Sequence, residues 1–136
     1  KDTIYQEADV ISVHVPLTKQ THNMIGLQQL RQMKPDALII NTSRGGIINE
    51  SDLYQVMNEG HLSGAAIDVF QDEPYVGPLG EIDRCLLTCH MGSMSIDCRS
   101  RMEIEATEEV VRFLRGLDLQ NLVPEDEYLS QHMFRG

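Results

Sequence analysis

Four short apolar runs that alternate with segments of helical pattern limit what this chain can fold into. The runs cover residues 10–15, 37–40, 64–70 and 86–89. Their length and near-continuous apolar content suit strands that are buried beneath helices on both faces of a sheet. Strands that alternate with helices form βαβ crossovers, so the order of these segments predicts a parallel sheet.

The connecting segments supply the predicted helices. Apolar residues recur at helical spacing at Leu27, Leu30 and Met33, at Leu53, Val56 and Met57, and at Met102, Ala106, Val110, Phe113 and Leu117. Pro35 ends the first pattern, and Asn49 and Gly60 are placed to cap the second. The third pattern predicts a long helix from about residue 96 to residue 117. The connection over residues 71–85 has no helical stripe and is predicted to be a loop over the functional site.

The glycine pattern indicates that half of a larger fold is missing. A complete dinucleotide-binding domain opens with a G-x-G-x-x-G turn between a strand and a helix. None of the ten glycines supplies that turn, and the chain begins at Lys1 without an initiator methionine. We therefore expect a fragment with an α/β fold, the second half of a Rossmann-like doubly wound sheet. It should contain about four parallel strands with crossover helices and a long C-terminal helix.

Composition excludes several classes of function. The 136 residues suit one domain, and the net charge of −10 disfavours binding to nucleic acid or an anionic membrane. No apolar run is long enough to span a membrane. Three cysteines, Cys85, Cys89 and Cys98, fit a reducing cytoplasm better than a disulfide scaffold. Together with His90 they lack the C-x-x-C spacing of a metal site, so no metal is expected.

Three of the apolar runs lead into ionisable residues. Arg44 follows the run that ends at residue 40, Glu73 follows the run that ends at residue 70, and His90 directly follows the last. The carboxyl ends of parallel strands meet at one edge of the sheet, where ligands of open α/β sheets bind. A cation, a carboxylate and an imidazole gathered there can hold an anion and move a proton.

Several segments resemble one enzyme family in order and spacing. Residues 41–46 (NTSRGG), 68–74 (DVFQDEP) and 88–93 (TCHMGS) resemble three signature blocks of the D-isomer-specific 2-hydroxyacid dehydrogenases. Shorter matches lie at residues 14–18, 33–35 and 60–66. The resemblance extends over roughly residues 8 to 116, and the phosphoglycerate, glycerate and hydroxypyruvate dehydrogenase group is the most similar branch.

The resemblance implies a two-domain enzyme that transfers a hydride between NAD(P)(H) and a D-2-hydroxy acid or 2-oxo acid. Residues 1–116 would form the C-terminal half of its NAD-binding domain. Residues 117–136 would form an acidic tail that returns toward the absent substrate domain. NAD is the expected cofactor, and NADP is not excluded because the acidic residue that selects between them would lie upstream. The family also implies a homodimer.

The resemblance assigns catalytic roles to the three ionisable residues. Arg44 would bind the substrate carboxylate through its planar guanidinium, His90 would be the general acid and base, and Glu73 would orient His90. Each residue also has an ordinary alternative. Arg44 could be a surface residue in a salt bridge and His90 a structural histidine. Asp72 competes with Glu73 as the carboxylate, although only the residue before Pro74 matches the family glutamate.

The remaining matches concern the cofactor. The predicted cofactor-binding residues are His14, Pro16, Thr42, Ser43, Arg44, Asp68, His90, Met91, Gly92 and Ser93. The resemblance implies that Asp68 holds the nicotinamide carboxamide. The alternative is that Asp68 binds a nearby backbone group, because an unpaired carboxylate inside an apolar strand is costly. His14 is equally consistent with a structural histidine.

One departure and one alternative function accompany the resemblance. Cys89 stands where the family usually has a proline before its histidine, so the placement of His90 could be looser in this chain. Some relatives are transcriptional corepressors that sense NAD(H) and keep much of the same motif set. The alternative to an enzyme is therefore a non-catalytic, NAD(H)-sensing binding module.

Overall fold

The computed structural model of this chain describes residues 2–123. Its contacts form two units, residues 1–91 and residues 92–136, and each is described by itself. The domain boundary after residue 116 stays a prediction. The predicted tail over residues 117–136 lies mostly outside the described residues.

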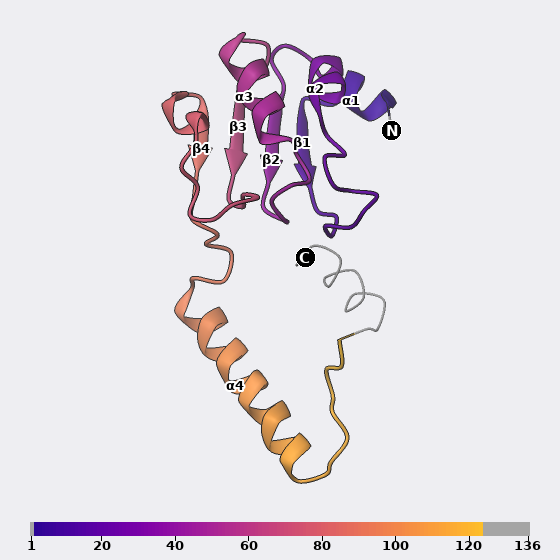
Figure 1. The fold of residues 1–136 in the computed structure, drawn as a ribbon, viewed down its shortest axis with the longest axis vertical. Helices are drawn as coiled ribbons and strands as arrows, with labels where there is room; N and C mark the ends of the chain where they lie inside the picture. The colour runs from indigo at the N-terminus through magenta and orange to yellow at the C-terminus, as the bar shows by residue number, and fades with distance from the viewer. Residues whose placement is uncertain (1, 124–136) are drawn as a thin grey trace. The chain divides into compact units, whose positions relative to one another are not determined.

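The first unit is built on a parallel four-stranded sheet (Figure 1). The strands are β1 (Val10–Val13), β2 (Leu38–Asn41), β3 (Gly64–Ile67) and β4 (Cys85–Leu87), and they lie side by side in that order. Every neighbouring pair is parallel, with Val13 opposite Asn41 and Asn41 opposite Ile67. The predicted half of a Rossmann-like fold is thereby confirmed, and the carboxyl ends of all four strands meet at one edge of the sheet.

Helices connect the strands as the sequence patterns predict. The helices of this unit are α1 (Asp2–Glu7), α2 (Leu27–Gln32) and α3 (Glu50–Asn58), with a short 3-10 helix η1 at Pro78–Glu81. The side chain of Asn49 caps α3 by accepting a hydrogen bond from the backbone N–H of Asp52 at 3.0 Å. Gly60 follows α3 with a φ of +79°, a left-handed conformation that glycine adopts without steric cost. The patterns did not indicate α1, and η1 lies in the connection that was predicted to lack a helix.

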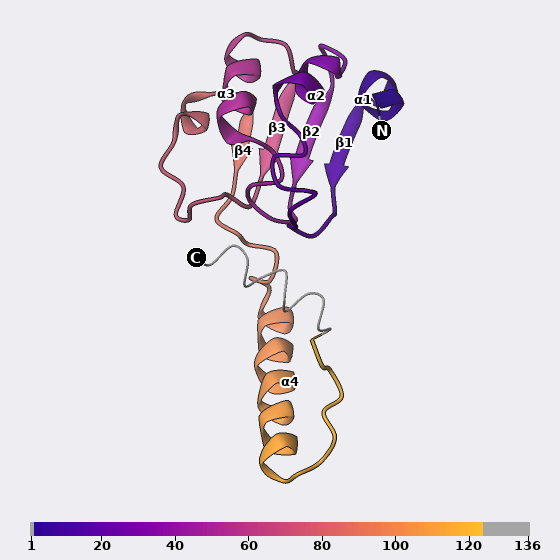
Figure 2. The same ribbon diagram turned by 45° about the vertical axis from the view of Figure 1, so that its right-hand side comes forward.

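The core of the first unit lies on one face of the sheet. Helices α2 and α3 contact each other on that face (Figure 2), over fully buried residues such as Ile39, Leu53 and Val56. The opposite face carries Val10, Leu38 and Leu86, which are 52%, 41% and 66% exposed. Within the described residues, helices therefore bury one face of this sheet, not both as the apolar runs predicted.

The second unit contains α4 (Ile96–Leu114), the predicted long helix. The hydroxyl of Ser95 caps its start by accepting a hydrogen bond from the backbone N–H of Cys98 at 3.2 Å. The helix ends earlier than the predicted residue 117, and Gly116 follows with a φ of +66°. The apolar stripe of α4, which includes Met102, Val110 and Phe113, is exposed in the described part of the chain. No helix among residues 2–123 is both long and apolar enough to cross a membrane.

Candidate active site at the carboxyl edge of the sheet

The turn that carries Arg44 is held by a buried amide side chain. Asn41, the last residue of β2, is 2% exposed. Its Oδ1 accepts hydrogen bonds from the backbone N–H and the hydroxyl of Ser43, at 3.1 and 2.8 Å. Its Nδ2 donates to the carbonyl oxygen of Arg44 at 3.0 Å. These bonds fix the chain direction directly before the arginine, a role of Asn41 that sequence reasoning missed. The available signal was a polar amide that ends an apolar run.

The guanidinium of Arg44 is exposed and has no carboxylate partner among residues 2–123. Its Nη1 donates a hydrogen bond of 2.7 Å to the carbonyl oxygen of the neighbouring Ser43. The alternative of a surface salt bridge is therefore not observed in the described part of the chain. Four of the five N–H donors of a guanidinium remain to receive a planar anion such as a carboxylate.

Glu73 contacts the imidazole of His90 directly. Glu73 Oε2 lies 3.0 Å from His90 Nδ1, and Glu73 Oε1 accepts a hydrogen bond from the backbone N–H of Phe70 at 3.0 Å. The bond to His90, and next the bond from Phe70, hold the pKa of the Glu73 carboxyl below its ordinary value, against a smaller opposing effect of burial. Between the two competing carboxylates, Glu73 and not Asp72 reaches the histidine.

The backbone at His90 is held in an unusual conformation. His90 has a φ of +52°, in the left-handed region that costs a non-glycine residue roughly 1–2 kcal/mol. Asp68 supports this turn, because its carbonyl oxygen accepts from the His90 N–H at 2.8 Å and its Oδ1 accepts from the Met91 N–H at 2.8 Å. The hydroxyl of Thr88 donates to the same Oδ1 at 2.5 Å. Asp68, which is 8% exposed, thus binds the backbone of this turn, and its role toward the cofactor stays a prediction.

A cavity of about 410 Å³ lies beside the pair. Phe70, Tyr75 and Leu87 make its wall mostly apolar, and Glu73 and His90 supply its ionisable groups. The rings of Phe70 and Tyr75 stack with their centroids 4.2 Å apart. The exposed thiol of Cys89 also lines the cavity.

The parallel strands bring most of the predicted cofactor-binding residues to the same edge of the sheet. His14 and Pro16 follow β1, Thr42 and Ser43 follow β2, and Asp68 directly follows β3. The His14 ring contacts the hydroxyl of Ser12 at 2.7 Å and is exposed. Met91 ends the first unit, whereas Gly92 and Ser93 begin the second. No cluster of side chains within residues 2–123 is suited to hold a metal ion.

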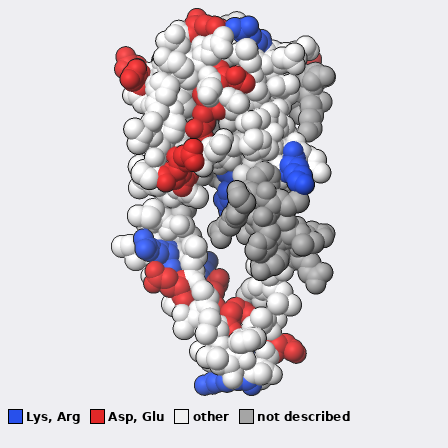
Figure 3. Space-filling model, in the orientation of Figure 1, with Lys and Arg blue, Asp and Glu red and all other residues white. Residues whose placement is uncertain are grey.

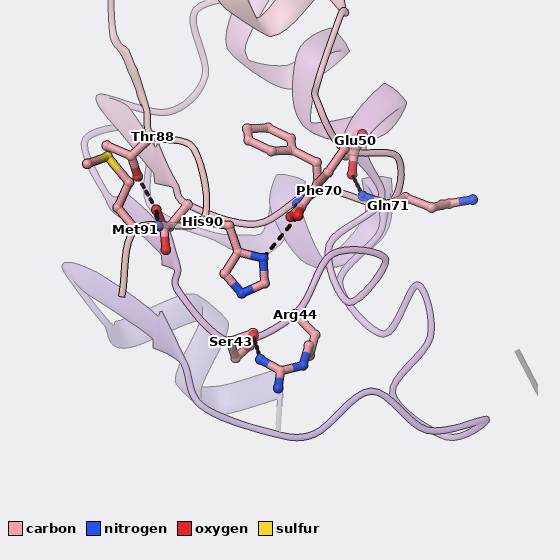
Figure 4. A network of polar contacts seen from close by, with 10 residues as sticks. Ser43, Arg44, Glu50, Phe70, Gln71, Thr88, His90 and Met91 are labelled. Atoms are coloured by element: carbon pink, nitrogen blue, oxygen red, sulfur yellow. Dashed lines mark hydrogen bonds and ion pairs between the residues drawn. The ribbon is translucent and has the colours of Figure 1, made fainter. Parts of the chain in front are cut away.

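The segments that carry Arg44 and Glu73 touch through Gly45. A Cβ atom on Gly45 would lie 2.0 Å from both the carbonyl carbon and the carbonyl oxygen of Phe70. No side chain therefore fits at this position without moving one of the two backbones. Figure 4 shows the two segments from close by, with the guanidinium of Arg44 bound to Ser43.

Comparisons with known proteins agree on one family. Residues 1–92 match the model of the D-isomer specific 2-hydroxyacid dehydrogenase, NAD binding domain. A glyoxylate reductase of Korarchaeum cryptofilum is 40% identical over 127 residues, which cover 92% of this chain and 38% of the relative. A D-3-phosphoglycerate dehydrogenase of Archaeoglobus fulgidus is 35% identical over 124 residues, 90% of this chain and 24% of the relative. The chain thus spans about two fifths or less of the length of these relatives.

Solved structures give the same result. A glyoxylate reductase from Paecilomyes thermophila superimposes with a TM-score of 0.82 at 30% identity, over 92% of this chain and 38% of its own. A D-lactate dehydrogenase from Lactobacillus jensenii, crystallised with NAD⁺, superimposes with a TM-score of 0.80 at 26% identity, over 90% and 42% of the two chains.

The tight contact at Gly45 predicts a marked loss of stability for Gly45→Ala. The added methyl group must displace the Phe70 backbone or the Arg44 turn, and such overpacking costs about 1–3 kcal/mol. Gly80→Ala is the matched control, because a Cβ atom at Gly80 meets nothing within 4 Å and the residue does not have a positive φ. Denaturant unfolding of the chain measures both changes. Equal stability of the two variants would contradict the contact.

The His90 contact predicts an acidic titration for Glu73. Since its pKa is lower in the folded chain, the ionised carboxylate stabilises the fold above the ordinary pKa of about 4.5. This stabilisation disappears as the pH falls through the lower, folded-state pKa. Carboxyl ¹³C NMR of the chain measures the titration, and His90→Ala should raise the pKa of Glu73 toward its ordinary value. An unchanged titration in that variant would show that the two side chains do not interact.

Proposed function

The chain belongs to the D-isomer specific 2-hydroxyacid dehydrogenase family, and from this premise we propose that it supplies the acid–base and carboxylate-binding groups of an NAD-dependent oxidoreductase. The complete protein interconverts a 2-oxo acid and the corresponding D-2-hydroxy acid. Its substrate is a small acid of the kind named by the relatives, which include glyoxylate reductases and D-3-phosphoglycerate dehydrogenases. Hydroxypyruvate and glycerate belong to the same chemical class. The homodimer and the cytoplasmic location stay predictions.

The observation that carries this proposal is the contact of 3.0 Å between Glu73 Oε2 and His90 Nδ1. An ionised carboxylate can only accept a hydrogen bond, so Nδ1 must carry the proton that it donates. In the neutral imidazole, Nε2 is then the unprotonated nitrogen and the atom that exchanges a proton with substrate. A carboxylate that orients a histidine in this way is a recurring arrangement for general acid–base catalysis.

The residues at the carboxyl edge also suit the cofactor of the family. Thr42 and His14 are polar and exposed where two parallel strands end, at the edge where open α/β sheets bind ligands. Thr42, Ser43, Asp68 and Met91 would lie along the cofactor, with Asp68 at the nicotinamide carboxamide, and His14 would lie on the adenine side. A bound nicotinamide supplies or accepts the hydride, which no side chain of this chain can do.

The chain's own residues account for the remaining chemistry. Arg44 binds the substrate carboxylate through its planar fork and draws electron density from the adjacent carbonyl. The protonated His90 gives its Nε2 proton to the carbonyl oxygen as the carbonyl carbon is reduced, which leaves an alcohol and a neutral imidazole. In the oxidation direction the neutral imidazole accepts the hydroxyl proton. Glu73 keeps the ring in one orientation through both directions.

The proton-transfer role is tested by substitutions in the complete protein. His90→Ala should lower kcat by about 10²–10⁴-fold, because the general acid is lost. Glu73→Gln should lower it less, and Asp72→Asn is the matched control, because Asp72 makes no contact with the imidazole. Steady-state kinetics with NADH and glyoxylate or hydroxypyruvate measure the effects. Full turnover by His90→Ala would end the mechanism, and NADH binding without turnover in the unmodified protein would favour the binding module.

The direction of the pH dependence gives a second check on the same histidine. Oxidation of the alcohol needs a neutral imidazole, so its rate should fall as the pH decreases. Reduction of the oxo acid needs the protonated form, so its rate should fall as the pH increases. Opposite slopes in kcat/KM measured for the two directions are expected. Flat profiles under conditions where the chemical step limits the rate would contradict the role of His90.

The carboxylate-binding role is tested by Arg44→Lys. Lysine keeps the positive charge but cannot form two parallel hydrogen bonds to a carboxylate. A lost hydrogen bond to a charged group costs about 1.5–3 kcal/mol, which corresponds to a decrease in kcat/KM of roughly 10- to 100-fold for the oxo acid. Arg31→Lys is the control, since Arg31 pairs with Glu59 at 3.0 Å on an exposed surface of α2 and α3. Equal kinetics of the two variants would remove Arg44 from the site.

A further inference from the structure

Glu50 links α3 to the loop that carries the acid–base pair. It is the first residue of α3, and its Oε1 accepts a hydrogen bond from the backbone N–H of Gln71 at 2.6 Å (Figure 4). Gln71 lies between Phe70, whose N–H binds Glu73, and Glu73 itself. The carboxylate of Glu50 therefore holds the backbone of Gln71, directly after the Phe70 N–H that orients Glu73.

Stability of α3 alone does not explain this arrangement. An acidic residue in the first turn stabilises a helix without contacting any other segment, and Asp52 already stands in that turn. Glu50 instead is partly buried, with its carboxylate directed to a residue 21 positions further along the chain. Burial raises the pKa of Glu50, the Gln71 N–H opposes this rise, and the negative charges of Asp72 and Glu73 add to it. The carboxylate of Glu50 is thus held near those of Asp72 and Glu73, although the three negative charges repel one another.

The acidic surroundings are visible on the molecular surface. Figure 3 shows acidic side chains gathered over the face of the first unit on which α3 lies. A hydrogen bond from a backbone N–H to an ionised carboxylate is about twice as strong as a bond between neutral groups. The bond from Gln71 therefore offsets the repulsion that Glu50 experiences at this position.

The connection between β2 and α3 holds the same two loop residues at a second point. Gly45 lies against the backbone of Phe70 and Gln71, where a Cβ atom would approach the Gln71 nitrogen to 2.4 Å. Glu50 restrains the Gln71 N–H from the other end of this connection. The segment that carries Arg44 thus fixes the start of the loop that carries Glu73 through two contacts. One is the close packing of Gly45 against the loop backbone, and the other is the hydrogen bond from the Gln71 N–H to Glu50.

We propose that Glu50 is a positioning residue, which holds Glu73 against His90 by anchoring the backbone of Gln71, and which ties that pair to the Arg44 turn. The proposal rests on the proposed function for its catalytic meaning. Its structural part concerns only the chain itself. Loss of the anchor should let residues 70–73 move away from the Gly45 turn and lengthen the contact between Glu73 and the imidazole.

The structural part is tested by NMR on the chain with three variants. Glu50→Ala removes the acceptor, Glu50→Gln keeps an oxygen acceptor without the charge, and Glu59→Ala is a control at the other end of α3. Glu50→Ala should raise the pKa of the Glu73 carboxyl toward its ordinary value and shift the Gln71 amide resonance. Glu50→Gln, which keeps an acceptor and removes the repelling charge, should leave the pKa of Glu73 low or lower it further, and Glu59→Ala should not change it.

Two results would overturn the proposal. One is a folded Glu50→Ala chain, judged by unchanged amide resonances in β2 and β3, in which Glu73 titrates as in the unmodified chain. The other is a Glu50→Gln chain in which the pKa of Glu73 rises as much as it does in Glu50→Ala, because the retained oxygen acceptor would then have no effect. If Glu50→Ala does not fold, Glu50→Asp takes its place, because the shorter side chain keeps the charge but no longer reaches the Gln71 N–H; the same rise in the pKa of Glu73 is expected, and an unchanged titration would overturn the proposal.

Kinetics of the complete protein separate this proposal from the proposed function. Glu50→Ala should lower kcat by about 10-fold, less than the roughly 10²–10⁴-fold that general acid–base catalysis contributes, with a smaller change in KM. Glu50→Gln should recover most of the rate. An active parent with a fully active Glu50→Ala variant would remove the positioning role and leave the function intact. An inactive parent in which Glu50→Ala still raises the pKa of Glu73 would remove the function and leave the positioning.

Discussion

The hydrogen bond between Glu73 and His90 is the interaction on which the account of this site depends. It brings together residues from two different connections, one after β3 and one after β4. In the proposed mechanism it also decides which imidazole nitrogen exchanges a proton with substrate. Each partner is restrained separately. Glu73 is bound to the backbone of Phe70, and the turn at His90 is bound to Asp68. A bond of this kind can keep a base oriented through a reaction only if both of its ends are fixed.

The fold provides these restraints through its parallel order. Because the carboxyl ends of the strands lie at one edge, side chains that are distant in sequence reach one another over short loops. Asp68 and Gly45 use this edge to join one loop to the next, by a hydrogen bond and by close backbone contact, and Asn41 fixes the turn that follows β2. The polar groups of the site are therefore partly satisfied before any ligand is present, which is the condition for preorganised binding.

Local sequence patterns were sufficient for the architecture. Alternating apolar runs and helical stripes predicted the four strands, and Asn49 and Gly60 predicted both ends of α3. The 3-10 helix at Pro78–Glu81 was missed because four residues carry no measurable periodicity. The expectation that helices cover both faces of the sheet was wrong within the described residues. The apolar residues of a strand indicate burial but do not identify the segments that pack against it.

The site could be predicted only where a residue lies within a few positions of the end of a strand. Arg44 and His90 could be placed in this way, whereas Glu73 also needed the family resemblance to distinguish it from Asp72. The roles of Gly45 and Glu50 depend on contacts with another loop, and that of Asn41 depends on the path of the turn that follows it. Such contacts depend on side-chain direction and loop path, which the spacing of residues in a sequence does not contain.

The most direct test of the central claim is the tautomer of His90. Long-range ¹H–¹⁵N NMR of the chain, at a pH where the imidazole is neutral, distinguishes a proton on Nδ1 from one on Nε2. The account predicts a protonated Nδ1 and an unprotonated Nε2, and predicts that Glu73→Ala abolishes this preference. A neutral imidazole that carries its proton on Nε2 in the unmodified chain would contradict the account.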